Sequence, residues 1–273
     1  MTNIIDDNTQ ADLIRVAHLV ADAARVETLR LFRVSGLIAD DKAKGAEVFD
    51  PVTEADRAAE AAMRAILEKE RPDDGILGEE LATKVGTTGL TWVLDPIDGT
   101  RGYISGTPTW GVLISVADAR GPQFGIIDQP YIGERFVGGF GISEMTGPRG
   151  TVQLETRKNR PFASATLLST FPEVGTAIER RAFEAVAKKV QLTRYGMDCY
   201  GYALLAAGQV DLVIEAGLHP YDIHAPIAVI QAAGGIVSNW QGGAAHMGGR
   251  VLAAANRDVQ SVALSILQDC IDD

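Results

Sequence analysis

Apolar residues recur along the first part of the chain with a spacing close to 3.6 residues. Between Thr9 and Val34 they lie at Leu13, Val16, Ala17, Val20, Ala24, Leu31 and Phe32. This period places them on one face of a helix, and Gly36 follows as a residue typical of a helix end. The pattern therefore predicts a long amphipathic helix that buries one face.

A second helix and several strands follow in the first half of the chain. Thr53 and Asp56 form a capping-box pattern before an alanine-rich segment that ends near Glu70. Short apolar runs bounded by Gly, Pro or acidic residues then predict strands. These runs are 75–78, 91–94, 109–118, 123–128 and 134–140. The last three runs are joined by short turns, which predicts an antiparallel meander.

The second half of the chain alternates between strand and helix patterns. Strands are predicted at 163–169, 190–195, 211–215, 236–240 and 251–254, and helices at 172–189, 198–207, 223–233 and 258–270. This alternation predicts an α/β (α+β) fold with layers of helix and sheet. The polar, turn-rich stretch 147–150 predicts a boundary between an N-terminal α+β lobe, 1–147, and a C-terminal α/β lobe, 148–273.

Composition and charge narrow the possible functions. The 273 residues are 46% hydrophobic, which is enough for a sizeable core. The net charge of −11 disfavours binding to nucleic acid or to an anionic membrane. Residues 1–10 lack a signal-peptide pattern, and no apolar run is long enough to span a membrane. With only two cysteines and no disulfide framework, we expect a cytoplasmic protein.

The most informative stretch is the motif LDPIDGTRG, which begins at the end of the apolar run 91–94. Asp95 and Asp98 lie in a turn after a buried strand, and the proline between them favours an extended backbone at Asp95. Both carboxylates can then converge on one point, beside the backbone N–H groups of Gly99 and Thr100. This combination suits a hard cation and a phosphate. A lone D-P-x-D could equally be a turn with an Asx cap.

The longer string D-P-I-D-G-T after an apolar strand is far more specific. It resembles the metal-binding signature of the inositol monophosphatase family, the lithium-sensitive, magnesium-dependent phosphatases. The resemblance implies a layered αβαβα sandwich, a small phosphorylated substrate and a homodimer. The helix and strand pattern is compatible with that sandwich but would not specify it alone.

The same resemblance implies an all-oxygen metal site. G-E-E at 78–80 looks like a family element whose first Glu binds metal, and Y-D-I-H-A-P at 221–226 is similar to the family's W-D-x-x-A-G/P segment. The implied ligands are Glu79, Asp95, the Ile97 carbonyl, Asp98 and Asp222. Oxygen ligands select Mg²⁺ or Mn²⁺ over Zn²⁺ or Cu²⁺, with two or three ions per site. From the residues alone, the Glu pair could be a solvated loop and Asp222 a helix cap.

The resemblance also implies how water is positioned. In the family the Asp of a T-x-x-D segment lies beside the Thr of the D-G-T turn, so Asp56 would orient Thr100. Glu79 and Thr100 would orient the attacking water, and Gly99 and Thr100 would contact the phosphate. Asp56 could otherwise serve only to start a helix. The spacing differs from the D-x-D-x-T of aspartyl-phosphate phosphatases, so direct attack by water is favoured over a phosphoenzyme.

Residues 194–202, together with 100–111, resemble the histidinol-phosphate phosphatase branch of the family. An anionic Asp198, with Glu215, would suit a substrate that carries an ammonium group and an imidazole, whereas inositol offers only hydroxyls. Asp198 could alternatively cap the helix that follows it, and Arg194 could contact substrate or pair with Asp198. Met197 departs from the Gly common in that branch, which affects the expected shape of the pocket.

We therefore expect a Mg²⁺-dependent phosphomonoesterase that converts L-histidinol phosphate to L-histidinol and phosphate. Another enzyme hypothesis is a phosphatase for inositol 1-phosphate or another small sugar or nucleotide phosphate. A hypothesis of a different class is a metal-loaded protein that regulates or scaffolds a partner without turnover. The complete acid set with Thr100 favours an enzyme, because a binding protein would not require groups that position water.

Overall fold

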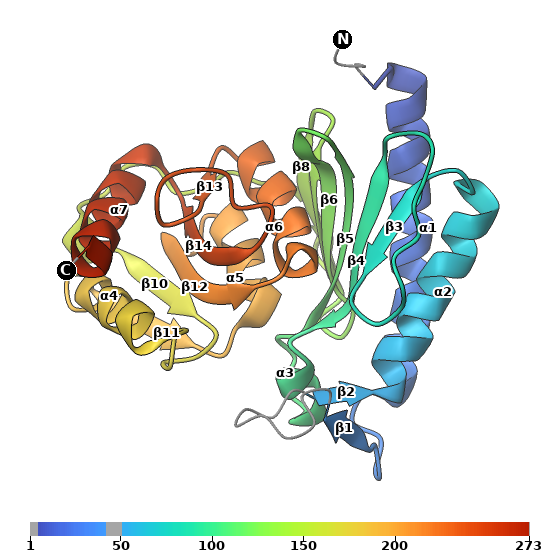
Figure 1. Cartoon of the computed structure of the whole chain (residues 1–273), viewed down its shortest axis with the longest axis horizontal. Coiled ribbons are helices and arrows are strands. Elements are labelled where there is room, and N and C mark those ends of the chain that lie inside the picture. The colour runs from blue at the N-terminus through green and yellow to red at the C-terminus, as the bar shows by residue number, and fades with distance from the viewer. Residues whose placement is uncertain (1–4, 42–50, 273) are drawn as a thin grey trace.

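The computed structural model describes residues 5–41 and 51–272. Its helices and sheets form five alternating layers, which confirms the predicted αβαβα sandwich (Figure 1). The helices of the three helical layers, from one side of the molecule to the other, are α1 (Asp7–Leu31) with α2 (Glu54–Glu70), α5 (Asp198–Ala206) with α6 (Pro220–Ala232), and α4 (Ala177–Ala187) with α7 (Arg257–Asp272).

The larger sheet lies between the first two helical layers. Its strands, in spatial order, are β3 (Gly75–Gly78), β4 (Thr91–Asp98), β5 (Gly111–Asp118), β6 (Gly121–Gln129), β7 (Glu134–Gly139), β8 (Ile142–Gly147) and β9 (Gly150–Gln153). Strands β3 and β4 are parallel and the later neighbours are antiparallel, so the predicted meander is confirmed. A separate antiparallel pair joins β1 (Ala39–Asp41) to β2 (Pro51–Thr53).

The smaller sheet lies between the second and third helical layers. Its spatial order is β11 (Leu192–Tyr195), β10 (Thr166–Ser169), β12 (Leu212–Leu218), β14 (Gly249–Ala254) and β13 (Ile236–Ser238). Strand β10 is parallel to both of its neighbours, and β14 is antiparallel to both of its own. A short 3₁₀ helix (Phe162–Ser164) precedes β10, where the sequence analysis expected the strand to have begun already.

The predicted apolar face of the first helix forms part of the core. Leu13, Val16 and Val20 of α1 are fully buried against α2 and the larger sheet. A second core fills the space around α5 and α6 between the sheets, and a third lies between the smaller sheet and the helices α4 and α7. Burial of this apolar surface is the main force that holds the layers together.

The turn-rich stretch 147–150 closes a hairpin. Gly147 of β8 pairs with Gly150 of β9, and the larger sheet continues to Gln153. Helix α6 contacts strands of both sheets, so residues from the second half of the chain complete the packing of the first. The division into two lobes at this point stays a prediction.

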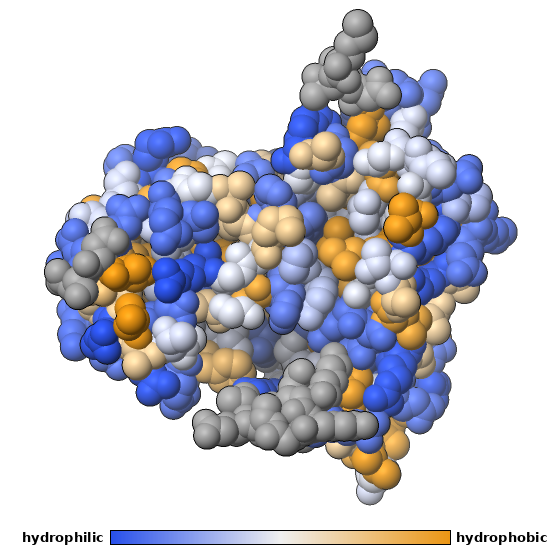
Figure 2. Space-filling view, in the orientation of Figure 1, coloured by the Kyte–Doolittle hydropathy of each residue, from blue (hydrophilic) through white to orange (hydrophobic). Residues whose placement is uncertain are grey.

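Polar and apolar side chains are interspersed on the molecular face shown in Figure 2. Within residues 5–41 and 51–272, no helix has both the length and the apolar character needed to cross a membrane.

Candidate active site

The end of strand β4 carries the first two acids of the site. The pairing of β4 with β5 shifts register between Asp95 and Asp98, and Gly99 then adopts a left-handed backbone with φ +87°. Thr100 begins the short helix α3 (Thr100–Ile104), which the sequence analysis did not predict. The Ile97 N–H donates to Oδ1 of Asp95 at 3.0 Å. An Asx-type turn is therefore present, and it coexists with an acidic cluster.

Three carboxylates converge at this turn. Asp95, Asp98 and Asp222 each contribute an oxygen, and these oxygens lie within 4.8 Å of one another. Burial raises the pKa of Asp95 well above its usual range, and the nearby Glu79, Asp98 and Asp222 raise it further. Glu79 is close enough to share a hydrogen bond with Asp95. A bound metal ion would neutralise such crowded negative charge.

The other two acids of the cluster are similarly perturbed. Burial and the charges of Asp198 and Asp222 raise the pKa of Asp98, although the Cys199 N–H donates to its Oδ2 at 2.6 Å. Burial is also the main cause that raises the pKa of Asp222 to about 7. Each acid is therefore held where ionisation is unfavourable without a cation.

Two of the candidate acids occupy the same position in a capping box. Oδ2 of Asp56 accepts from the Thr53 N–H at 2.8 Å, at the start of α2. Oδ2 of Asp222 accepts from the His219 N–H at 2.6 Å, at the start of α6. Both acids therefore help to start their helices, each as the third residue of its capping box, and the N-cap at α6 is His219 and not Asp222. Since a carboxylate has two oxygens, capping leaves each acid an oxygen for the site.

Asp56 and Thr100 meet although they are distant in sequence. The Thr100 hydroxyl lies 3.2 Å from Oδ1 of Asp56 and 3.2 Å from the Ile97 carbonyl oxygen. Asp56 is fully buried, and it also accepts from the Thr53 hydroxyl at 2.6 Å. The hydrogen bonds from Thr53 therefore hold the Asp56 carboxylate in place. The fixed carboxylate in turn sets the direction of the Thr100 hydroxyl.

A pocket of about 320 Å³ brings most of the predicted residues together. The predicted residues that line it are Glu79, Asp98, Gly99, Thr100, Asp198, Glu215 and Asp222. Asp95 and Asp56 lie buried behind this wall. Arg194 is exposed on β11 and is not among the lining residues, and no ion pair joins it to Asp198 in the described part of the chain.

Asp198 faces the D-G-T turn and does not cap its own helix. It is a rare non-glycine residue with a positive φ, +47°, and its Oδ2 accepts from the Thr109 hydroxyl at 3.3 Å. A Cβ atom at Gly99 would lie 2.7 Å from the Asp198 carboxyl carbon, so only glycine fits there. Burial, with the charge of Glu215, raises the pKa of Asp198 to about 6.

Glu215 lies nearly buried at the end of β12. Its Oε1 accepts from the N–H of Thr170 at 2.9 Å and from the Thr170 hydroxyl, and its Oε2 accepts from the Tyr202 hydroxyl at 2.6 Å. Three donors therefore hold this carboxylate at the pocket wall, close enough to Asp198 for its charge to raise the pKa of that acid.

Several residues of the site were missed by the sequence analysis. Thr170 and Tyr202 hold Glu215, and the Cys199 N–H holds Asp98. Arg101 places its guanidinium 4.8 Å from the centre of the Phe171 ring at the pocket wall. Cys199 and Tyr202 lie in the stretch 194–202 that was already singled out. Thr170 and Phe171 carry no local signal, because only the folded sheet brings them to the pocket.

The layered fold and the acidic pocket agree with a class of hydrolases that act on phosphate monoesters, and the family match assigns the chain to this class. A sequence model of the inositol monophosphatase family matches residues 10–272, and the chain belongs to that family. The chain is 37% identical over 267 residues to the bifunctional phosphatase IMPL2, chloroplastic, of Arabidopsis thaliana, which covers 93% of this chain and 74% of that protein. The cytoplasmic location expected for this chain stays a prediction.

Two further similarities bear on activity and fold. The chain is 32% identical over 257 residues to a histidinol-phosphatase of Streptomyces coelicolor, which covers 90% of this chain and 93% of that protein. A solved structure of an inositol monophosphatase from Zymomonas mobilis superposes with a TM-score of 0.83 at 39% identity, and the match covers 94% of this chain and 98% of that one.

Proposed function

We propose that this chain is a Mg²⁺-dependent phosphomonoesterase that hydrolyses L-histidinol phosphate to L-histidinol and phosphate. The observation that carries this proposal is the charge of the pocket. Among the lining residues, Arg101 carries a guanidinium and six residues carry carboxylates. These six are Glu79, Asp98, Glu173, Asp198, Glu215 and Asp222. A phosphate monoester would be repelled from such a pocket unless bound cations reversed the local charge.

The residues that would hold those cations are Glu79, Asp95, the Ile97 carbonyl, Asp98 and Asp222. Their fit to Mg²⁺ or Mn²⁺ is supported by an all-oxygen donor set and by the close approach of Asp95, Asp98 and Asp222. The raised pKa values of these three acids support it too, because they reflect burial together with crowded negative charge. Two or three bound ions would bind the phosphate, lower the pKa of a water molecule and stabilise the leaving oxygen.

The chain's own residues would orient the attacking water. Asp56 accepts a hydrogen bond from the Thr100 hydroxyl, so a lone pair of that hydroxyl can accept a hydrogen bond from water. Glu79 lines the same pocket and would accept the second hydrogen bond from that water. Gly99 and Thr100 lie at the start of α3, and their backbone N–H groups would donate hydrogen bonds to the phosphate.

Asp198 and Glu215 account for the choice of substrate. Neither belongs to the group of three close carboxylates, yet both line the pocket, and Asp198 lies against Gly99. Two acids beyond the proposed metal ligands match a leaving group that carries an ammonium and an imidazole. Such a group would donate charge-assisted hydrogen bonds to both carboxylates, whereas a neutral polyol would leave Asp198 poorly matched. The similarity to a histidinol-phosphatase supports the same choice.

A second candidate substrate is inositol 1-phosphate, or another small sugar or nucleotide phosphate. It is favoured by the 39% identity to the inositol monophosphatase of Zymomonas mobilis. A regulatory protein without turnover is disfavoured by the contact between Asp56 and Thr100, which metal binding alone would not need.

The test is a profile of phosphate release by the purified protein with Mg²⁺. The substrates are histidinol phosphate, inositol 1-phosphate, fructose 1,6-bisphosphate and adenosine 3′,5′-bisphosphate. We expect the highest kcat/KM on histidinol phosphate. A higher value on inositol 1-phosphate would overturn the substrate assignment, and no release from any of the four would overturn the enzyme assignment.

A further inference from the structure

A buried carboxylate outside the acidic cluster contacts the segment that carries Glu79. Glu60 lies on α2 and is fully buried. Its Oε2 accepts from the Glu80 N–H at 2.7 Å, and its Oε1 accepts from the Leu81 N–H at 3.2 Å. The carboxylate thus holds the chain immediately after Glu79, although it is 20 positions earlier in sequence.

Arg64 completes this contact one turn further along α2. Its Nε donates to Oε1 of Glu60 at 2.8 Å, which neutralises the buried charge. Its two terminal nitrogens donate to the carbonyls of Leu81 and Ala82, at 3.1 Å and 3.0 Å. The pair therefore holds residues 80–82 by backbone N–H groups and by backbone carbonyls at once.

Glu60 also contacts the residue before Glu79. A Cβ atom placed on Gly78 would lie 2.0 Å from Oε1 of Glu60, so the carboxylate and the glycine backbone are in close contact. One side chain therefore touches both chain neighbours of Glu79, namely Gly78 and Glu80. With its backbone held on both sides, Glu79 has few ways to move away from Asp95.

We propose that Glu60 and Arg64 are positioning residues that set the metal affinity of Glu79 without touching the metal. This inference rests on the proposed function in one respect, since it takes Glu79 as a metal ligand. Asp56 and Glu60 lie one turn apart on α2, and the first orients Thr100 while the second fixes the Glu79 backbone. A single helix would then position both groups that orient the water.

The experiment measures Mn²⁺ binding without substrate, from the EPR signal of free Mn²⁺. The Mn²⁺ dissociation constant that rises in the variant Glu79→Gln identifies the binding step to which Glu79 contributes. In Glu60→Gln the amide offers one acceptor oxygen where the carboxylate offered two, so its NH₂ group must face a donor. We expect the dissociation constant of the Glu79 step to rise by about tenfold or more, as is typical when a residue that supports a ligand is altered.

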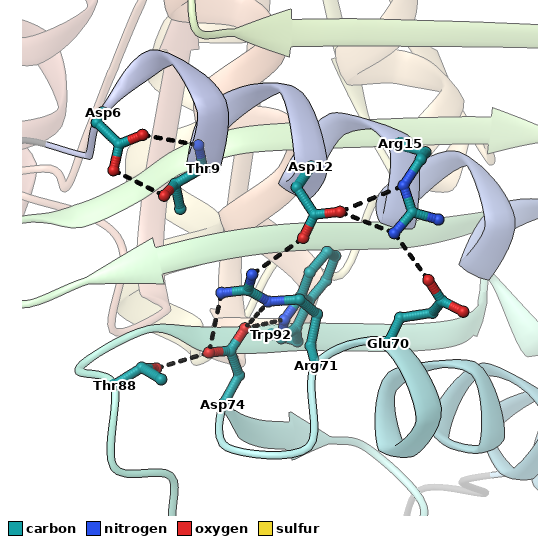
Figure 3. A network of polar contacts seen from close by, with 9 residues as sticks. All are labelled: Asp6, Thr9, Asp12, Arg15, Glu70, Arg71, Asp74, Thr88 and Trp92. Carbon is teal, nitrogen blue, oxygen red and sulfur yellow. Dashed lines mark hydrogen bonds and ion pairs between the residues drawn. The ribbon is translucent and has the colours of Figure 1, made fainter.

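The polar network in Figure 3 provides a matched control. Asp74 is 1% exposed and is paired with Arg71 at 2.8 Å, as Glu60 is paired with Arg64. It also accepts from Trp92 Nε1 at 3.0 Å. Asp74 precedes Glu79 by five residues, and Trp92 precedes Asp95 by three residues on β4. These separations are about 17 Å and about 10 Å of extended chain. Asp74→Asn should lower Tm by an amount similar to Glu60→Gln, roughly 5–10 °C, and leave Mn²⁺ binding unchanged.

Three outcomes decide the proposal. Weaker Mn²⁺ binding in Glu60→Gln but not in Asp74→Asn supports it. Unchanged Mn²⁺ binding in a folded Glu60→Gln overturns it and leaves Glu60 with a structural role. If Glu60→Gln does not fold, Arg64→Lys decides in the same way, since it keeps the buried charge paired but cannot hold both carbonyls. Because no substrate is used, this result is independent of whether the phosphatase assignment holds.

Discussion

The hydroxyl of Thr100 lies 3.2 Å from the carboxylate of Asp56, across 44 positions of sequence. The contact joins the first turn of α2 to the end of β4. The hydroxyl has one proton and two acceptors within reach, Asp56 and the Ile97 carbonyl. A carboxylate is the stronger acceptor of the two, so the proton is directed toward Asp56 and a lone pair faces away from it.

Asp56→Asn should lower kcat on the best substrate by about a hundredfold, because the hydroxyl loses the charged acceptor that orients it. The amide oxygen can still accept from the Thr53 N–H, so α2 should form as before. The control is Glu54→Gln, which removes an exposed charge from the same helical turn. A kcat within twofold of the wild type in Asp56→Asn would remove Asp56 from the mechanism.

Asp95→Asn should abolish activity and strongly reduce the stabilisation of the protein by Mg²⁺. The amide can accept from the Ile97 N–H as the carboxylate does, but it cannot supply the charge that a cation requires. Since burial and then the neighbouring acids raise the pKa of Asp95, the metal-free variant should melt at a higher temperature than the metal-free wild type at pH 8. Thermal melting with EDTA and with Mg²⁺ measures both effects. Wild-type activity at the same Mg²⁺ concentration would contradict the assignment.

The raised pKa values also predict how stability depends on pH without metal. Asp222 has a pKa raised to about 7 from an ordinary value of 3.8. Between these values the native state binds more protons than the unfolded state, so Asp222 makes the free energy of unfolding fall as pH rises through this window. Mg²⁺ binding displaces the proton, and the Mg²⁺-induced rise in Tm should therefore grow from pH 5.5 to pH 8.

The difference between wild type and Asp222→Asn reports the contribution of Asp222 together with its effect on the neighbouring Asp95 and Asp98. In EDTA the wild type should lose stability relative to the variant as pH increases from 5.5 to 8. A gain relative to the variant would mean that the Asp222 carboxylate is favourably paired without metal, and the sign of the prediction would be wrong.

The parts of the fold that local patterns encode could be predicted from the sequence. The apolar period of α1, the capping box of Thr53 and Asp56, and the strand before Asp95 are all local signals. Strand β9 was missed because every one of its residues is exposed and shows no apolar alternation. The turn between β8 and β9 has the same composition as a linker, so 147–150 could be interpreted either way.

The residues of the candidate site likewise include some that local sequence signals indicate and others that only the folded chain brings together. Asp95 and Asp98 lie three positions apart in one motif, whereas the contacts that hold Glu215 join strands and helices far apart in the chain. The Glu60 carboxylate looks like any acid on an amphipathic helix until the backbone of Glu80 is placed against it. Arg194 is the opposite case. Its motif indicated a place in the site, but on its strand the residue is exposed and does not line the pocket.

The last prediction concerns the choice of substrate. Asp198→Asn keeps the shape of the side chain and can still accept from the Thr109 hydroxyl, but it removes the charge. Loss of a charge-assisted contact should cost about 1.5–3 kcal/mol, which is roughly tenfold to a hundredfold in kcat/KM on histidinol phosphate. Hydrolysis of p-nitrophenyl phosphate should be nearly unchanged, because that substrate carries no cation.

The pH dependence gives this prediction a second, independent measurement. Asp198 has a pKa raised to about 6, chiefly by burial, so its negative charge is lost as pH falls through this value. The ratio of kcat/KM for histidinol phosphate to that for p-nitrophenyl phosphate should therefore fall below pH 6 in the wild type. Asp198→Asn should show a low ratio with no such fall. If Asp198→Asn lowers kcat/KM equally on both substrates, Asp198 has a structural role. If it lowers kcat/KM on neither substrate, inositol phosphate becomes an equal candidate.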